Sequence, residues 1–269
     1  MSEHSVTQGT YRYLEEPSHY RDLVDRYDNF LFEALPGVVS VLEKLRKRNK
    51  RVLFVTNNAS KSRATLLKRF KELGIQASEN EVFSSASASA LYLKEVLKFP
   101  SDRKVTLAEL YVTMLTQDPK EHIKVEGTDF SPLLQHGAMD DGVAAVLCGI
   151  DTGMNYAKMA KAFRYLTREN ATDAVQSIRE ASKRMPTVIG KPNQPMLDAI
   201  LASHSFDRSR TLMVGDRLNT DIAFGTHGGL DTLLVLTGIS KREEVHGDNP
   251  PAVPTYITNG LGDLDVLEP

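Results

Sequence analysis

The chain has 269 residues, of which 41% are hydrophobic and 25% charged, and its formal net charge is −2. These fractions are those of a globular protein and exclude a disordered chain. This net charge gives no basic field for nucleic acid, and no stretch combines clustered Lys and Arg with interleaved aromatic residues. No apolar run is long enough to span a bilayer. Its single cysteine, Cys148, excludes an internal disulfide, and the N-terminus has no apolar leader, so we expect a cytoplasmic protein.

The first hundred residues alternate apolar runs with stretches whose apolar residues follow helical spacing. The expected elements are strands at 27–32, 51–55 and 82–83 and helices at 38–45, 66–73 and 90–97. Gly74 lies directly after the second of these helices, at the position where glycine most often ends one. This order of strand and helix is typical of a parallel α/β sheet.

The rest of the chain returns to this pattern only after a polar middle section. A strand at 143–150 and a helix at 156–166 are predicted between two polar stretches. Further strands are expected at 187–189, 211–214, 232–236 and 256–257. We therefore predict an α/β core formed by residues 1–99 and 186–269, with a truncated domain inserted at residues 100–185.

A hydroxyl residue and two amides follow the predicted strand at 51–55. Thr56, Asn57 and Asn58 are expected where this strand turns into a helix, whose unpaired N–H groups and dipole favour an anion. They are therefore candidates for binding a phosphoryl group. The alternative is that one of them only caps the helix, as such residues do routinely.

Lys191 follows the predicted strand at 187–189 and stands between Gly190 and Pro192. A lysine in such a place can neutralise a phosphoryl group during its transfer. The alternative is an ordinary solvated lysine on the surface, which is what most lysines are.

Two carboxylates follow the predicted strand at 211–214. Asp216 and Asp221 stand five residues apart, and oxygen ligands of this kind suit Mg²⁺. The alternative is an Asx turn followed by a helix cap. Because ligands of open α/β sheets bind beyond the carboxyl ends of the strands, a hydroxyl, a lysine and carboxylates at three such ends predict one shared site.

Three segments resemble the second, third and fourth motifs of the haloacid dehalogenase superfamily, and most closely those of its 4-nitrophenylphosphatase and phosphoglycolate phosphatase branch: residues 54–63, 190–197 and 213–221. The resemblance implies a Rossmann-like core with an inserted α/β cap domain. It also implies Mg²⁺-assisted transfer of a phosphoryl group from a small phosphorylated metabolite to an aspartate. Thr56 and Asn57, with Asn58 beside them, are then expected to bind the phosphoryl group. Lys191 is expected to steady that group, and Asp216 to bind Mg²⁺ with support from Asp221.

The chain departs from the family pattern at its first motif. That motif is an apolar strand followed by Asp-x-Asp-Gly, in which the first aspartate attacks and the second is the general acid and base. Here Phe32 is followed by Glu33, and the residue two positions further on is Leu35. Family elements are also absent from two stretches of the cap. One lies between Arg103 and the predicted strand at 143–150, and the other follows the helix that ends near Leu166. Together these gaps suggest omitted segments or a decayed copy.

Two hypotheses follow. The first is a Mg²⁺-dependent phosphatase of small phosphomonoesters such as 4-nitrophenyl phosphate or phosphoglycolate, acting through an aspartyl-phosphate. The alternative is a catalytically dead relative or an incomplete isoform that binds phosphate or a protein partner. No nucleic acid or membrane is expected as a partner, and formation of a homodimer is left open.

Overall fold

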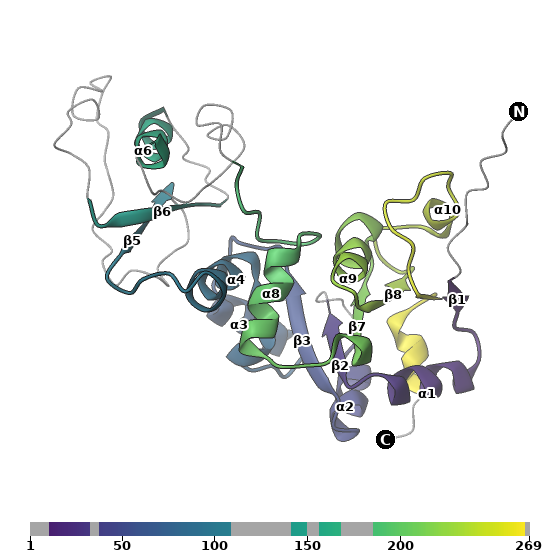
Figure 1. Ribbon diagram of the computed structural model, residues 1–269. Coiled ribbons are helices and arrows are strands. Elements are labelled where there is room, and N and C mark those ends of the chain that lie inside the picture. The colour runs from purple at the N-terminus through teal and green to yellow at the C-terminus, as the bar shows by residue number, and fades with distance from the viewer. Residues whose placement is uncertain (1–10, 33–37, 109–140, 150–155, 168–184, 267–269) are drawn as a thin grey trace, which may run out of the picture.

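The structure is a computed structural model that describes residues 11–32, 38–108, 141–149, 156–167 and 185–266. Its main element is a seven-stranded sheet in the order β1-β9-β8-β7-β2-β3-β4, and every neighbouring pair in it is parallel (Figure 1). The strands are β1 (Arg12–Tyr13), β2 (Asn29–Phe32), β3 (Arg51–Thr56), β4 (Val82–Ser84), β7 (Thr211–Gly215), β8 (Asp231–Val235) and β9 (Tyr256–Thr258). The parallel α/β core expected from the sequence is thus confirmed.

Helices cover both faces of this sheet. They are α1 (Pro17–Arg26), α2 (Val39–Lys47), α3 (Arg63–Glu72), α4 (Ser85–Leu91), α8 (Gln194–Ser203), α9 (Ala223–His227) and α10 (Arg242–Val245). Two π turns extend this set, Tyr92–Val96 after α4 and Leu218–Ile222 before α9. Three short 3₁₀ helices lie at Glu79–Glu81, Arg208–Arg210 and Leu261–Val266. Leu73 and then Gly74, with a φ of 79°, end α3 as the sequence predicted.

Alternate residues of the central strand enter two separate cores, which explains why its sequence is apolar throughout. Phe30 and Phe32 of β2 pack with residues of α1, α2 and α3, whereas Leu31 packs with residues of α4, α8 and α9. All four residues of β2 are buried. A strand with both faces covered reads as a continuous apolar run.

A second, two-stranded parallel sheet stands apart from the first in Figure 1. It consists of β5 (Lys104–Ala108) and β6 (Val143–Cys148), and α6 (Tyr156–Thr167) packs on it. Val146, Tyr165 and Leu166 are buried in a small core of its own. The predicted strand at 143–150 therefore ends at Cys148. Most of the polar middle section, at residues 109–140 and 168–184, lies outside the described residues.

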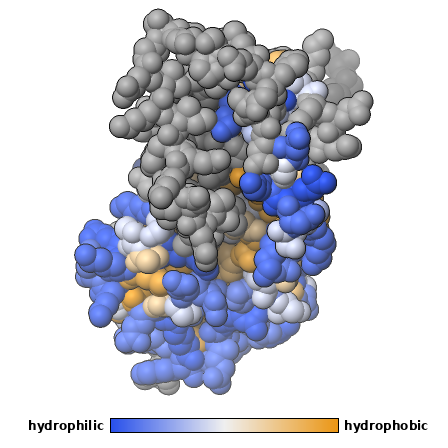
Figure 2. Space-filling model, turned by 90° about the vertical axis from the view of Figure 1, so that its left-hand side faces the viewer, coloured by the Kyte–Doolittle hydropathy of each residue, from blue (hydrophilic) through white to orange (hydrophobic). Residues whose placement is uncertain are grey.

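Figure 2 shows the side of the molecule that carries this smaller unit. Hydrophilic residues cover much of the coloured surface there, with hydrophobic patches between them. Exposed large hydrophobic residues of the described chain include Val96 and Leu97 after α4 and Phe163 on α6. In the part of the chain that the structure describes, no helix combines the length and the apolar character needed to cross a membrane.

One predicted strand is wrong. Residues 185–190 are irregular, although Val188 and Ile189 are apolar and were expected in a strand at 187–189. The central strand β2 is already paired with β3 on one side and β7 on the other, so the sheet has no vacant position there. Val188 is accordingly 53% exposed. Lys191 therefore does not follow a strand.

Candidate functional site

The strand order reverses at β2, so the carboxyl end of β2 is the switch point of the sheet. From β2 the chain proceeds to β3 and β4 on one side, whereas β7, β8 and β9 lie on the other side. Phe32 is in register with Phe54 of β3 and Val214 of β7. Open α/β sheets bind ligands where the strand order reverses in this way. Glu33, the residue that follows Phe32, lies outside the described residues.

Lys191 reaches the carboxyl ends of the strands from the loop before α8. Its ammonium donates to Oδ1 of Asp221 at 2.6 Å and to the carbonyl oxygen of Val55 at 2.8 Å. The side chains of Lys191 and Asp221 are only 2% and 3% exposed. The alternative of a solvated surface lysine is therefore wrong. This buried ion pair joins the loop before α8 to the ends of β3 and β7.

Asn57 fixes the backbone of Lys191. Its Oδ1 accepts from the Lys191 N–H at 2.7 Å, and its Nδ2 donates to the Lys191 carbonyl oxygen at 2.8 Å. Ser85 in turn donates its hydroxyl to the carbonyl oxygen of Asn57 at 3.0 Å. The Asn57 amide thus holds a loop 134 positions away in the sequence. Both polar atoms of the Asn57 side chain are engaged in this way. The backbone N–H of Asn57 is therefore the candidate group for binding a phosphoryl oxygen.

Thr56 and Asn58 do not cap the helix that follows them. Ser62 is the N-cap of α3, because its hydroxyl oxygen accepts from the Thr65 N–H at 3.1 Å. The half-buried Thr56 accepts from the Asn58 N–H at 3.3 Å. Asn58 accepts from the N–H and the hydroxyl of Ser60, at 2.9 and 2.7 Å. The capping alternative is therefore wrong, and Thr56 presents its hydroxyl at the end of β3.

Asp216 and Asp221 have different roles. The Asp216 carboxylate accepts from the Ile239 N–H at 3.0 Å, and its backbone carbonyl accepts from the Ser240 N–H at 2.9 Å. These partners lie 23 and 24 positions away, so no Asx turn forms as the alternative required. Asp221 lies within the π turn Leu218–Ile222 and pairs with Lys191. The sequence analysis missed residues 238–240, whose only signal is their place after the predicted strand at 232–236.

The carboxylate of Asp216 has the chemistry of a Mg²⁺ ligand. It is half-buried, directly follows β7 and has its orientation fixed by a backbone N–H. Among the described residues there is no group of three His, Cys, Asp or Glu side chains that could hold a metal by themselves. Mg²⁺ commonly binds one or two carboxylates and completes its shell with water and phosphate oxygens. One carboxylate held by a backbone N–H at the carboxyl end of β7 fits that mode. Asp221 is instead paired with Lys191.

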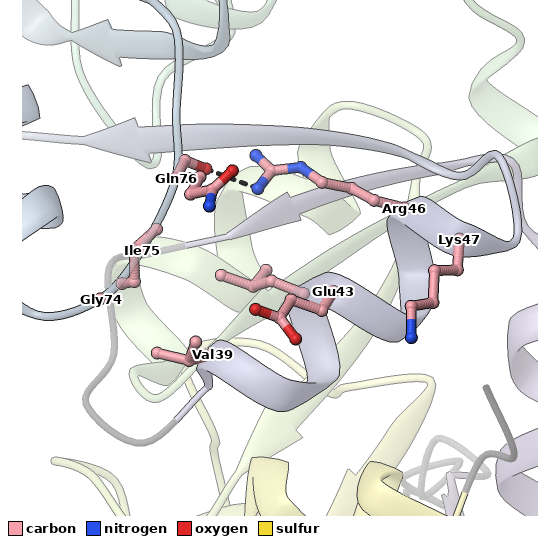
Figure 3. Close-up of a pocket in the computed structure, with 8 residues that line it drawn as sticks. Val39, Glu43, Arg46, Lys47, Gly74, Ile75 and Gln76 are labelled. Atoms are coloured by element: carbon pink, nitrogen blue, oxygen red, sulfur yellow. Dashed lines mark hydrogen bonds between the residues drawn. The ribbon is translucent and has the colours of Figure 1, made fainter.

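A separate hollow lies away from these residues, between α2 and the loop after α3 (Figure 3). It has a volume of about 370 Å³ and is lined in part by Val39, Leu42 and Ile75. Across it the Arg46 guanidinium donates to the Gln76 carbonyl oxygen. None of the residues that line it is one of the candidate site residues described above.

The fold and the site together define a doubly covered parallel α/β protein with a lysine, a hydroxyl and a carboxylate at its switch point. The family model described as haloacid dehalogenase-like hydrolase matches residues 31–116, and a related HAD-hydrolase-like model matches residues 188–264. A 4-nitrophenylphosphatase of Schizosaccharomyces pombe is 35% identical, over 93% of this chain and 97% of that protein. Phosphoglycolate phosphatase 2 of Arabidopsis thaliana is 34% identical, over 93% and 96%. The chain therefore belongs to the haloacid dehalogenase-like hydrolase family, beside these two kinds of phosphatase.

Solved structures support the same fold. A 4-nitrophenylphosphatase from Thermotoga maritima matches with a TM-score of 0.70 at 23% identity, over 90% of this chain and 98% of that one. NagD from E. coli K-12 matches with a TM-score of 0.67 at 23% identity, over 89% and 99%. The yeast protein is aligned over 296 positions, more than the 269 residues of this chain. It therefore has residues without a counterpart here, as the gaps noted in the sequence led us to expect.

Proposed function

We propose that this chain is a Mg²⁺-dependent phosphatase of small phosphomonoesters, of the 4-nitrophenyl phosphate or phosphoglycolate type, with a low turnover. The observation that carries the proposal is the buried Lys191, which Asp221 and the Val55 carbonyl hold at the ends of β7 and β3. It brings a positive charge, the Thr56 hydroxyl and the Asp216 carboxylate to one edge of the sheet. This combination suits a phosphoryl group.

Each retained residue has a role that follows from its position. The Thr56 hydroxyl and the backbone N–H of Asn57 bind phosphoryl oxygens, since they lie at the end of a strand. Lys191 stabilises the negative charge of the phosphoryl group. Asp216 is the protein ligand for Mg²⁺, which when bound supplies further positive charge to that group.

The family route to hydrolysis passes through an aspartyl-phosphate. A carboxylate oxygen attacks phosphorus, the ester oxygen leaves with a proton from a general acid, and water then hydrolyses the acyl phosphate. In this chain Glu33 is the carboxylate next to Phe32, and its extra methylene displaces the attacking oxygen by about 1 Å, a change that can lower the rate about a hundredfold. With Leu35 at the position of the general acid, a further 10²–10⁴-fold, roughly, is lost.

The test is release of 4-nitrophenol from 4-nitrophenyl phosphate in the presence of Mg²⁺. We expect slow release that EDTA abolishes. Lys191→Met combined with Asp221→Asn is the control, because it removes the ammonium without leaving one buried charge unpaired. Release no faster than in this control, with the wild-type chain folded, would contradict the proposed activity.

A second candidate is a protein that binds phosphate or a phosphorylated metabolite without turnover. The absence of Asp-x-Asp after Phe32 favours it. It predicts heat of binding for inorganic phosphate and for Mg²⁺ in calorimetry, together with no release of 4-nitrophenol. A chain that binds neither would exclude this candidate as well as the phosphatase.

A further inference from the structure

Segment 238–240, which follows β8, holds Asp216 from two directions. The Ile239 N–H binds its carboxylate and the Ser240 N–H binds its backbone carbonyl, at 3.0 and 2.9 Å. The Ile239 side chain itself is 57% exposed, so this residue acts on Asp216 through its backbone. The orientation of the carboxylate is therefore set by a neighbouring strand end and not by its own loop alone.

Gly238 is required because Asp216 occupies the space of a side chain. A Cβ atom added to Gly238 would lie 2.0 Å from Oδ2 and 2.2 Å from Cβ of Asp216. A Cβ atom that comes within 3.0 Å of another heavy atom forces one of the two groups to move. Any larger residue at position 238 must therefore displace the carboxylate, or else the loop that holds it.

Ser240 fixes segment 238–240 in turn. The residue is 3% exposed, and its hydroxyl oxygen accepts from the Leu218 N–H at 3.1 Å. The hydroxyl also donates to the Glu244 carboxylate of α10 at 3.5 Å. Ser240 thus ties the segment both to the π turn that follows Asp216 and to α10.

We propose that Gly238 and Ser240 are positioning residues for the Mg²⁺ ligand Asp216, and that they set the affinity of the site for the metal. The inference rests on the proposed function, since it assumes that Asp216 binds Mg²⁺. Residues that orient a metal ligand typically change metal affinity by about 10- to 100-fold when they are replaced. Ser240 contacts neither the metal nor the substrate in this scheme and acts only through Asp216.

The test is calorimetric titration of the full chain with Mg²⁺ alone. We expect Gly238→Ala to weaken binding by about 100-fold and Ser240→Ala by about 10-fold relative to the wild type. Gly262→Ala is the matched control, because no atom lies within 4 Å of its added Cβ. Asp216→Asn gives the reference for loss of the ligand.

A merely structural role would act through stability, so melting temperatures are measured in parallel. Leu264→Ala serves as a destabilised reference, since Leu264 is 2% exposed and packs in the core with residues of α1 and α2. It should lower the melting temperature without weakening Mg²⁺ binding. If Gly238→Ala should fail to fold, Ser240→Ala carries the test by itself.

The outcomes separate the inference from the proposed function. The inference is overturned if a folded Ser240→Ala or Gly238→Ala variant binds Mg²⁺ with wild-type affinity while Asp216→Asn does not bind it. The assignment of Asp216 as the Mg²⁺ ligand would then still stand. No Mg²⁺ binding by the wild type would overturn both. Weakening that is confined to these variants and absent from Leu264→Ala would support the inference.

Discussion

Lys191 and Asp221 form an ion pair that is almost completely withdrawn from solvent, with 2.6 Å between Nζ and Oδ1. The two residues belong to different loops, one before α8 and one after β7. Because the lysine also donates to the Val55 carbonyl, the pair connects three separate segments at the switch point. The ion pair therefore holds these segments in place, and it also supplies the positive charge of the site.

Replacing Asp221 by Asn should destabilise the fold strongly. The change removes the carboxylate that pairs with the buried ammonium, and breaking a buried pair in this way costs about 3–5 kcal/mol. Urea denaturation followed by circular dichroism measures the free energy of unfolding. Adding Lys191→Met should restore part of the loss, because the buried charge is then gone.

The exposed pair Arg69–Glu72 on α3 is the control for this measurement, with side chains 60% and 50% exposed. Glu72→Gln should change the free energy of unfolding by less than about 1 kcal/mol. Equal effects of Asp221→Asn and Glu72→Gln would contradict the importance given to the buried pair.

Asn57→Ala should loosen the loop that carries Lys191. Two hydrogen bonds to the Lys191 backbone are lost, and at about 1 kcal/mol each they predict a loss of roughly 2 kcal/mol in stability. We also expect weaker binding of inorganic phosphate in calorimetry, because the ammonium is less well placed. Asn58→Ala is the comparison variant for stability, since among the described residues its side chain bonds to nearby Ser60 and should cost less.

The stability of the fold should decline at alkaline pH in a way that depends on Tyr27. Burial, together with hydrogen bonds to Asp231 and Tyr256, raises the pKa of the Tyr27 phenol far above its usual range. A raised pKa in the folded state stabilises the protein fully below the unfolded pKa of about 10. Above that pH the unfolded chain releases the proton and the contribution is lost, by about 1.4 kcal/mol per pH unit.

Tyr27→Phe carries no such proton. Its free energy of unfolding should therefore start lower at neutral pH, where the hydrogen bond to Asp231 is missing, and fall less steeply above pH ~10. Urea denaturation at several alkaline pH values compares the two slopes. Parallel curves for the wild type and the variant would show that Tyr27 is not the group responsible.

Restoring the family's first motif should raise turnover. The triple change E33D/L35D/P36G places Asp-x-Asp-Gly directly after Phe32, at the carboxyl end of β2. From the losses given above, we expect 4-nitrophenyl phosphate hydrolysis to increase by at least about 100-fold. The same triple change made with Lys191→Met and Asp221→Asn is the control. No gain in rate would mean that the segments missing elsewhere in the chain also disable the site.

Most of the core could be predicted from the sequence, because strands covered on both faces appear as apolar runs. The runs containing Phe30, Val55 and Met213 all became buried strands. The expected strand containing Val188 shows the limit of this signal. A threonine and two apolar residues between Pro186 and Gly190 look the same in the sequence whether or not the sheet has a place for them. Strand β1 has only two residues and was not predicted. Helix α1 was also missed, although its buried residues Tyr20, Leu23 and Val24 follow helical spacing.

The residues of the candidate site could be predicted from the sequence, but their interactions could not. Its residues could be selected because they follow strands or stand beside Gly and Pro, which are local features. Their partners could not, since the contacts of Lys191 with Asp221 and with Asn57 span 30 and 134 positions. The helix cap at Ser62 also depends on where the helix begins, and it lies beyond Thr56, Asn57 and Asn58, the three residues considered for that role.

The helices on either side of the insertion pack against each other. The π turn after α4 ends at Val96, shortly before the small sheet begins, and both it and α4 contact α8, which follows the return of the chain (Figure 1). The large α/β core is thus packed continuously across the two positions at which the chain leaves it and returns to it. Residues can be gained or lost between these two junctions over evolution without disturbing the register of any strand in the large sheet. The packing of α4 and its π turn against α8 therefore holds the core together independently of the length of the chain between them.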